Sequence, residues 1–213
     1  MKQLTILMLS FFFFPVLSYA QVLVGGMDEY IDYANIVRNS SGPNNKYSEM
    51  AGIPFLNEDF EMGTVKLRNG QLYKGPLRYD IYADEIEFKT KDGKIYEIRN
   101  PETVEKVAIG ERKFLCFAKE EGRNMDGLFE ELVNGDFTLL SKHRVYLKDA
   151  VPAKPYVEPK PATFIKKKSN YLVIDTEGDV ISVASKQDLL ILASNTSEAK
   201  SFIKKNKVKI GDE

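Results

Sequence analysis

The chain has 213 residues, of which 43% are hydrophobic and 29% are charged, and its formal net charge at pH 7 is −1. This length suits one sizeable domain, or one domain with a small appendage. A nearly balanced charge argues against nucleic acid or an anionic lipid surface as a partner, because either would call for a basic patch. The only cysteine, Cys116, excludes an internal disulfide, so the fold must depend on an ordinary hydrophobic core.

Residues 1–20 have the pattern of a signal peptide. Lys2 gives a positive start, an apolar run with four consecutive phenylalanines follows, and Ser18 and Ala20 place small residues before a cleavage site. The run is shorter than the roughly 20 residues that a spanning helix needs, so we expect cleavage after Ala20 rather than an anchor. Removing the first 20 of the 213 residues leaves 193, and we expect a soluble protein in the periplasm or outside the cell.

Residues 21–55 show the least regular pattern. In the stretch MDEYIDYANIV, residues 27–37, one stripe contains Tyr30, Tyr33 and Val37, which is compatible with one short helix. The stretch RNSSGPNNK after it has the composition of a loop. We expect this N-terminal segment to be extended or partly helical.

Residues 56–150 are dominated by a period of two, which is typical of strands with one buried face. Turn-forming pairs separate the alternating segments at Asn69-Gly70, Asp92-Gly93 and Asn134-Gly135. Asparagine or aspartate before glycine favours a hairpin turn, because both central positions need positive φ. The sequence therefore predicts a mainly β fold, an antiparallel meander that forms a curled sheet, a barrel or a sandwich. The pattern does not choose among these, since closure depends on strand stagger.

Four prolines change the composition at residues 151–165, and their spacing disfavours helices and central strands. We interpret this stretch as a semi-rigid connector, with a segment that lies along the first domain as the alternative. Residues 166–213 then predict a small unit of one β-hairpin, turning at Glu177-Gly178, and two short helices that begin at Ser185 and near Ser197. Because this unit is small for an independent core, we expect it to dock on the meander or on a partner.

Sequence patterns that carry catalytic or metal chemistry are scarce. The only histidine, His143, lies in an alternating segment without a nucleophile turn, which favours a solvated or edge-packed side chain over a catalytic triad. One histidine and one distant cysteine leave too few ligands for zinc, and the sequence has no glycine-rich phosphate loop. Cys116 lies in an apolar run and is interpreted as a packed thiol. We therefore predict no catalytic residue, no metal site and no cofactor.

The strongest candidates for a binding surface lie in and beyond the first predicted hairpin. They are Tyr73, Arg78, Tyr79, Asp80, Tyr82, Asp84 and Tyr96. Tyrosines stack on sugars or peptides, and they are equally ordinary cross-strand partners in a sheet. If residues 78–84 form one strand, the charged members and Tyr82 point one way while Tyr79 points the other.

Carboxylates are the only abundant groups of catalytic type. Asp80, Asp84 and Glu85 lie close together in the sequence and could serve glycoside hydrolysis or, equally, calcium binding. Neither spacing is diagnostic, and charged residues on the wet face of a sheet are what alternation predicts. We therefore favour the interpretation that these carboxylates are simply exposed.

Two stretches resemble a recurring pattern in uncharacterised exported β-rich proteins of Gram-negative bacteria. They are GTVKLRNGQLYKGPLRYDIYADEIEFK, residues 63–89, and SKQDLLILASNTSEAKSFIKKNKVKI, residues 185–210. The resemblance implies export and a shared architecture, and it carries no biochemical activity. Only about a quarter of the mature chain is covered.

These observations together favour a non-enzymatic exported protein that binds or scaffolds in the cell envelope. The expected partner is a glycan, a peptide or an envelope protein, and not nucleic acid. The alternatives are a carboxylate-dependent glycan hydrolase using Asp80, Asp84 or Glu85, and a structural subunit of an envelope assembly that makes contact through its C-terminal helices or a free sheet edge.

Overall fold

The computed structural model describes most of the chain beyond the predicted signal peptide. The described residues are 24–34, 38–39, 46–98, 102–119, 125–156, 158–192, 201 and 204. The predicted signal peptide and the predicted start of the second C-terminal helix, near Ser197, lie outside these residues.

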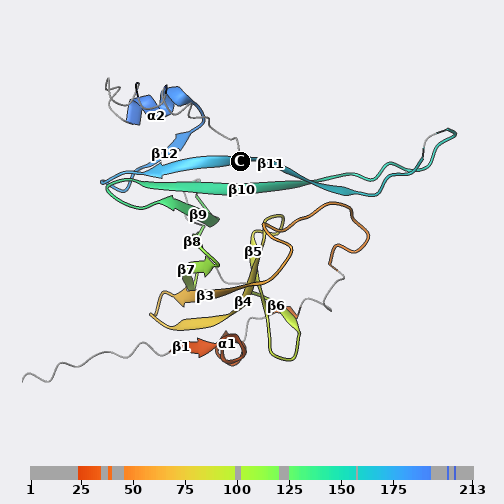
Figure 1. The fold of residues 1–213 in the computed structure, drawn as a ribbon, viewed down its shortest axis with the longest axis horizontal. Helices are drawn as coiled ribbons and strands as arrows, with labels where there is room; N and C mark the ends of the chain where they lie inside the picture. The colour runs from red at the N-terminus through yellow and green to blue at the C-terminus, as the bar shows by residue number, and fades with distance from the viewer. Residues whose placement is uncertain are drawn as a thin grey trace, which may run out of the picture.

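The described chain forms one open sheet with two short helices (Figure 1), which confirms the predicted mainly β fold. The first strands are β1 (Val24–Gly26), β2 (Arg38–Asn39), β3 (Glu61–Leu67), β4 (Leu72–Asp80), β5 (Glu85–Lys89) and β6 (Ile95–Ile98). The later strands are β7 (Val104–Ile109), β8 (Arg112–Phe117), β9 (Gly127–Val133), β10 (Thr138–Lys148), β11 (Thr163–Ile174) and β12 (Val180–Val183). The helices are α1 (Met27–Ala34) and α2 (Lys186–Leu192), and neither is long and apolar enough to cross a membrane.

The strand order is β12-β11-β10-β9-β8-β7-β3-β4-β5-β6-β2, and β1 adds to β4 in parallel. From β3 onward, sequence neighbours pair antiparallel except at one place, where β7 pairs with β3 instead of β6. This pairing joins two meanders into one sheet. The sheet is not closed, and its curl brings β5 and β6 opposite β7, β8 and β9. Of the architectures that the sequence left open, the chain adopts the curled sheet.

Local turn signals place the hairpins where the sequence predicts them. Gly70 connects β3 to β4 with φ of 88°, and Gly93 connects β5 to β6 with φ of 83°, a region that glycine enters without steric strain. Asn69 supports the first turn by accepting the backbone N–H of Gln71. At the other end of the chain, the predicted cap of α2 is present, because Ser185 Oγ accepts the Asp188 N–H.

Strands β10 and β11 form a two-stranded ribbon that extends beyond the rest of the sheet (Figure 1). Pairing runs from Thr138 with Ile174 to Lys148 with Thr163, and an isolated bridge joins Val151 to Lys160. The proline-rich stretch, which we predicted to connect two units, is therefore the turn end of this ribbon. Prolines are tolerated there because few ladder hydrogen bonds are needed. The boundary placed at residue 166 falls inside β11, so the sheet continues across it.

The main core fills the inside of the curl. Its most deeply buried members come from strands that are distant in sequence, and they include Val65, Leu77, Phe88, Val107 and Phe114. Helix α1 covers one end of this core with Met27 and Tyr30. A smaller cluster of Met125, Phe129 and Leu140 forms separately.

Cys116 belongs to the main core, as predicted for a packed thiol. Burial, helped by the charge of Asp84, raises the pKa of this thiol to about 11. Because the thiolate is the nucleophile, this shift disfavours a nucleophilic role for Cys116 at neutral pH.

Candidate functional site

The seven candidate binding residues do not share one surface. Strand β4 ends at Asp80, residues 81–84 form a turn, and Asp84 has φ of 58°. The assumption of a single strand over residues 78–84 is therefore wrong, because the chain must reverse within four residues to begin β5. The participation of the seven candidate residues in binding remains a prediction. Most of their contacts are with other residues of the protein.

Most of the candidate tyrosines pack against other aromatic rings of the protein. Tyr73 contacts Tyr30 edge-on, with 5.0 Å between ring centroids, and Tyr96 stacks on Phe88 at 5.5 Å. Tyr82 is 43% exposed and contacts Tyr47 and Phe164, so it does not lie with Tyr73 and Tyr96. Tyr96 is therefore a cross-strand partner within the sheet. Tyr73 packs against α1.

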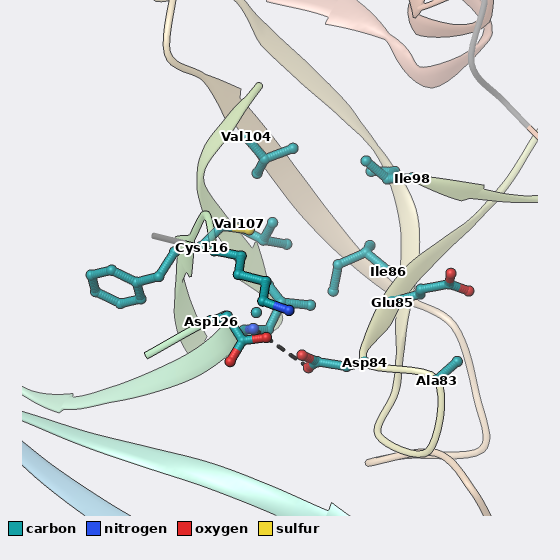
Figure 2. Close-up of a pocket in the computed structure, with 13 residues that line it drawn as sticks. Ala83, Asp84, Glu85, Ile86, Ile98, Val104, Val107, Cys116 and Asp126 are labelled. Carbon is teal, nitrogen blue, oxygen red and sulfur yellow. Dashed lines mark hydrogen bonds between the residues drawn. The ribbon is translucent and has the colours of Figure 1, made fainter. Parts of the chain in front are cut away.

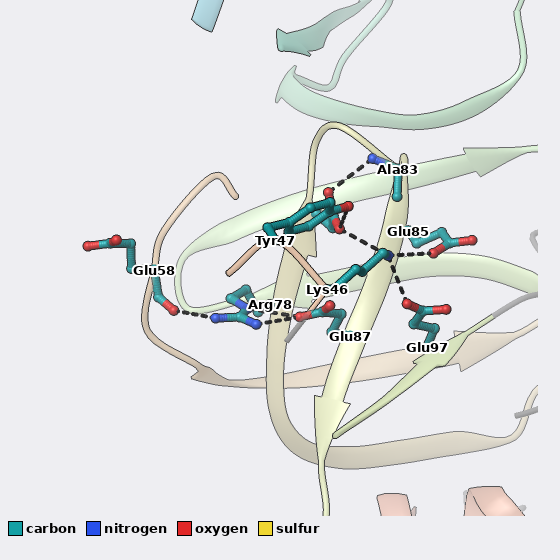
Figure 3. Close-up of polar contacts among 9 residues, drawn as sticks. Lys46, Tyr47, Glu58, Arg78, Ala83, Glu85, Glu87 and Glu97 are labelled. Carbon is teal, nitrogen blue, oxygen red and sulfur yellow. Dashed lines mark hydrogen bonds and ion pairs between the residues drawn. The ribbon is translucent and has the colours of Figure 1, made fainter. Parts of the chain in front are cut away.

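The carboxylates of β4, β5 and β6 are held around one ammonium group (Figure 3). Lys46 Nζ lies 2.8 Å from Glu97 Oε1 and 3.3 Å from Asp80 Oδ2. A third carboxylate oxygen, Glu85 Oε2, lies 3.4 Å away. Burial alone would lower the pKa of Lys46, but the hydrogen bond to Glu97 and the charge of Asp80 outweigh it and raise that pKa. The ammonium therefore stays charged at neutral pH.

Asp80 is completely buried, and its carboxylate contacts both Lys46 and Tyr47. Tyr47 donates its hydroxyl to Asp80 Oδ2 at 2.7 Å, and the Ala83 backbone N–H donates to Oδ1 at 3.0 Å. Burial and the hydrogen bond to Asp80 raise the pKa of Tyr47. The interpretation of Asp80 as a solvated carboxylate is wrong, because a segment with loop composition covers it.

Arg78 is built into the same face (Figure 3). Its Nη2 and Nε lie 2.6 Å and 3.0 Å from Glu87 Oε2, and its Nη1 donates to the Glu58 carbonyl at 2.8 Å. The guanidinium also stacks 3.6 Å above the Phe55 ring. Desolvation raises the pKa of the buried Glu87 despite this pairing. Arg78 is thus committed to internal contacts.

A pocket of about 370 Å³ opens where β5 and β6 face β7, β8 and β9 (Figure 2). Apolar side chains face each other across it, with Val104 and Val107 opposite Ile98 and Ile86. Asp84 lies at its polar end, next to Asp126.

Asp84 bridges the two sides of the curled sheet at this pocket. Its Oδ2 lies 2.6 Å from Lys142 Nζ, and its Oδ1 accepts the Tyr79 hydroxyl at 2.6 Å and the Leu128 N–H at 3.4 Å. Burial and the charge of Asp84 raise the pKa of Tyr79. The carboxylate therefore fixes the β4–β5 turn to the start of β9, which is a structural role.

His143 occupies a polar site that sequence reasoning missed. Its Nε2 lies 2.6 Å from Glu130 Oε2, and both side chains are buried. Arg112 Nη1 lies 3.1 Å from the same oxygen, and Ser169 Oγ lies 3.4 Å from His143 Nδ1. Burial would raise the pKa of Glu130, but His143 and Arg112 outweigh it and lower that pKa. Of the two predicted alternatives, a solvated or an edge-packed side chain, the solvated one is wrong because His143 is buried.

A β-bulge explains how His143 meets Ser169. The register of β10 and β11 shifts between the pair Lys142–Asn170 and the pair Arg144–Lys167. Two residues of β11, Lys168 and Ser169, therefore lie opposite His143 alone. Bulges redirect side chains locally, and the sequence offers no marker for this one.

The ribbon concentrates positive charge. The segment from Thr138 to Ile174 contains eight lysines and arginines and two acidic residues, so its net charge is +6 while the rest of the chain carries −7. Alternation puts Arg144, Tyr146 and Lys148 on one exposed face of β10. From the near-neutral total charge we inferred that the protein has no basic patch. That inference is wrong, because the positive charge of the ribbon is balanced by negative charge elsewhere in the chain.

Among the residues that the structure describes, no group of three or more His, Cys, Asp or Glu side chains could hold a metal ion. The chain matches no protein-family model, and neither the curated proteins nor the solved structures give a match. Function is therefore inferred from the sequence and the geometry alone.

Proposed function

We propose that the protein is an exported, non-enzymatic binding protein of the cell envelope, with the β10–β11 ribbon as its binding element and an acidic polysaccharide as its partner. The observation that carries this proposal is the separation of a basic ribbon from an acidic body. A field concentrated in this way attracts anionic partners to one end of the molecule and repels them from the other.

The ribbon suits an extended ligand. Alternate residues on one strand face lie about 7 Å apart, so Arg144, Tyr146 and Lys148 form a row that a linear polymer can follow. Lys167 lies beside this row, and its ammonium lies 4.4 Å above the Tyr146 ring. At the tip, Tyr156 is fully exposed. Tyrosines offer apolar faces with a polar end, which suits contact with sugar rings.

The signal-peptide pattern supports a polysaccharide rather than nucleic acid, because an exported protein meets envelope glycans. The alternative of a carboxylate-dependent hydrolase receives less support. Asp80 is buried beneath Tyr47, and Asp84 is paired with Lys142, so both would have to leave their present contacts to reach a substrate.

The test compares binding of the mature chain to polygalacturonate and to its fully methyl-esterified, uncharged form by isothermal titration calorimetry. We expect binding to the acidic polymer only, and weaker binding as salt rises. Replacing Arg144, Lys148 and Lys167 with glutamine should weaken binding about tenfold or more, since three favourable charges are lost.

A matched control removes three exposed lysines of the body, Lys89, Lys91 and Lys113, by the same substitution, and circular dichroism checks that both variants are folded. The control should bind as the parent does. Equal loss in both variants, no binding to the acidic polymer, or tighter binding to single-stranded DNA would overturn the proposal.

A further inference from the structure

A pocket of about 540 Å³ lies at the outer edge of the ribbon, and its chemistry is more specific than the general charge around it. We name it the bulge pocket. Its polar lining consists of Arg144, Lys167, Lys168, Ser169, Asn170, Tyr171 and Ser182. Three cationic groups, three hydroxyls and one amide therefore surround a single recess, with no carboxylate among the lining residues.

Two features of the backbone build this recess. β12 pairs with β11 only from Tyr171 to Ile174, so β11 continues beyond the end of its neighbour. The bulge then places Lys168 and Ser169 together opposite His143. In a regular strand, consecutive side chains would point to opposite faces. Here five consecutive residues, 167–171, line one recess where β12 ends.

The Ser169 hydroxyl is positioned from beneath the pocket. Ser169 Oγ lies 3.4 Å from His143 Nδ1, and Glu130, itself bound by Arg112, holds the opposite nitrogen of the imidazole. The Tyr79 ring packs 6.5 Å from the imidazole, centroid to centroid. Buried contacts with Glu130 and Tyr79 thus hold the imidazole, and the imidazole positions the Ser169 hydroxyl.

We propose that the bulge pocket is a subsite for a phosphoryl group. A phosphomonoester carries about −1.5 to −2 charges at pH 7 and three strong acceptor oxygens. The three positive charges of the pocket outnumber the single negative charge of a carboxylate. They match the charge of a dianion more closely. Ser169, Asn170 and Ser182 add neutral donors. The inference rests on the proposed function, because it assigns the phosphoryl group to a substituent of the acidic polysaccharide.

The first experiment titrates the mature chain with inorganic phosphate, sulfate and acetate at constant ionic strength, followed by amide NMR. Phosphate should shift the amides of residues 167–170 and 182–184 and should bind about tenfold more tightly than acetate. Equal responses to all three anions, or shifts elsewhere, would overturn the subsite.

Variants separate the pocket from the rest of the ribbon. Ser169→Ala, or Ser182→Ala if the first variant does not fold, should weaken phosphate binding by several fold. Lys148→Gln, on the ribbon outside the pocket, should leave phosphate binding unchanged while it weakens polymer binding. For the positioning residue, His143→Leu should lose phosphate affinity and His143→Gln, which keeps a polar group toward Ser169, should restore part of it.

The source of the phosphoryl group is tested with a mannan carrying phosphomonoesters, the same mannan after phosphatase treatment, and vesicles containing phosphatidic acid. Tighter binding to the phosphorylated mannan supports the inference. Binding to the vesicles alone would overturn the polysaccharide source. Phosphate binding without binding to any acidic polymer would refute the proposed function and leave the subsite standing, and the reverse result would refute only the subsite.

Discussion

Lys46 holds together the polar face of β4, β5 and β6, because its ammonium contacts the carboxylates of Asp80, Glu85 and Glu97. Lys46→Met would leave these carboxylates close together without that countercharge. Breaking a buried ion pair from one side costs about 3–5 kcal/mol, and partial exposure of Lys46 reduces this, so we expect a loss of about 2 kcal/mol in the free energy of unfolding.

Urea denaturation of the Lys46→Met variant measures this loss. The matched control is Lys94→Met, which removes a lysine from a solvent-exposed pair with Asp92. The control should leave the urea midpoint unchanged, because water screens that pair. Equal midpoints for the two variants would show that the Lys46 cluster contributes nothing to stability.

Three residues predict how stability changes at alkaline pH. The pKa values of Lys46, Tyr47 and Tyr79 are all raised in the folded protein, so each holds its proton more tightly than in the unfolded chain. Stability from these groups is fully present below their unfolded pKa values, near 10, and is lost as pH rises beyond them.

The urea midpoint should therefore begin to fall above about pH 10 and should keep falling as the pH rises further. Tyr79→Phe should make this fall shallower, because it removes one of the three protons. A variant with the same slope as the parent protein would show that Tyr79 does not hold its proton as inferred.

Among the elements, β3 joins the two meanders, because β4 pairs with one of its edges and β7 with the other. A Cβ atom at Gly63 would meet the Ala108 carbonyl of β7 and the Leu77 side chain of β4. Gly63→Ala should therefore force two strands apart and destabilise the fold by about 1–3 kcal/mol. Gly135→Ala, where a Cβ would meet nothing within 4 Å, is the control. Thermal melts that rank the two variants equally would contradict this account of β3.

The elements that could be predicted are those with local signals. Asn69-Gly70 specifies its turn from within, and Ser185 caps α2 in the same way. The β3–β7 pairing could not be predicted, because the residues within a strand do not specify which distant strand pairs with it. The β10–β11 pairing was obscured by the prolines between them, which are equally suited to a connector.

The candidate site was less predictable than the fold for a similar reason. Alternation of polar and apolar residues identifies the polar face that carries Asp80 and Glu87. It does not show whether that face is exposed to water or covered by another segment of the chain. Lys46 ends the stretch with loop composition and Tyr47 follows it, so no signal pointed to them. The grouping of His143 with Ser169 depends on a bulge, and the positive ribbon was hidden because the total charge is balanced.

On the scale of the whole molecule, an aromatic cluster ties the ribbon to the body. Tyr47 contacts Phe164 of β11 at 4.9 Å and Phe55 at 6.0 Å, between ring centroids, and Tyr82 contacts Phe164 at 5.0 Å. The backbone adds to this link, since the Phe164 N–H donates to the Ala51 carbonyl at 2.8 Å. The segment that covers Asp80 is therefore anchored on the ribbon.

Phe164→Ala should destabilise the protein by about 3 kcal/mol, because it opens a cavity in this cluster. Hydrogen exchange measured by mass spectrometry should become faster both in residues 46–56 and in residues 81–84. Tyr156→Ala, at the fully exposed tip, is the control and should change neither region. Faster exchange confined to the ribbon would show that the cluster does not join the two parts.

The pairing of β3 with β7 also sets an order for folding. A chain that emerges N-terminus first can form the β3–β4 and β4–β5 hairpins early, because their contacts are local. The hydrophobic interior stays open on one side until Val104 and the residues after it arrive to cover the other edge of β3. Contacts between distant segments form slowly, so assembly is completed late. Such a delay would suit the export that we propose, because an exported polypeptide crosses a membrane before it becomes compact.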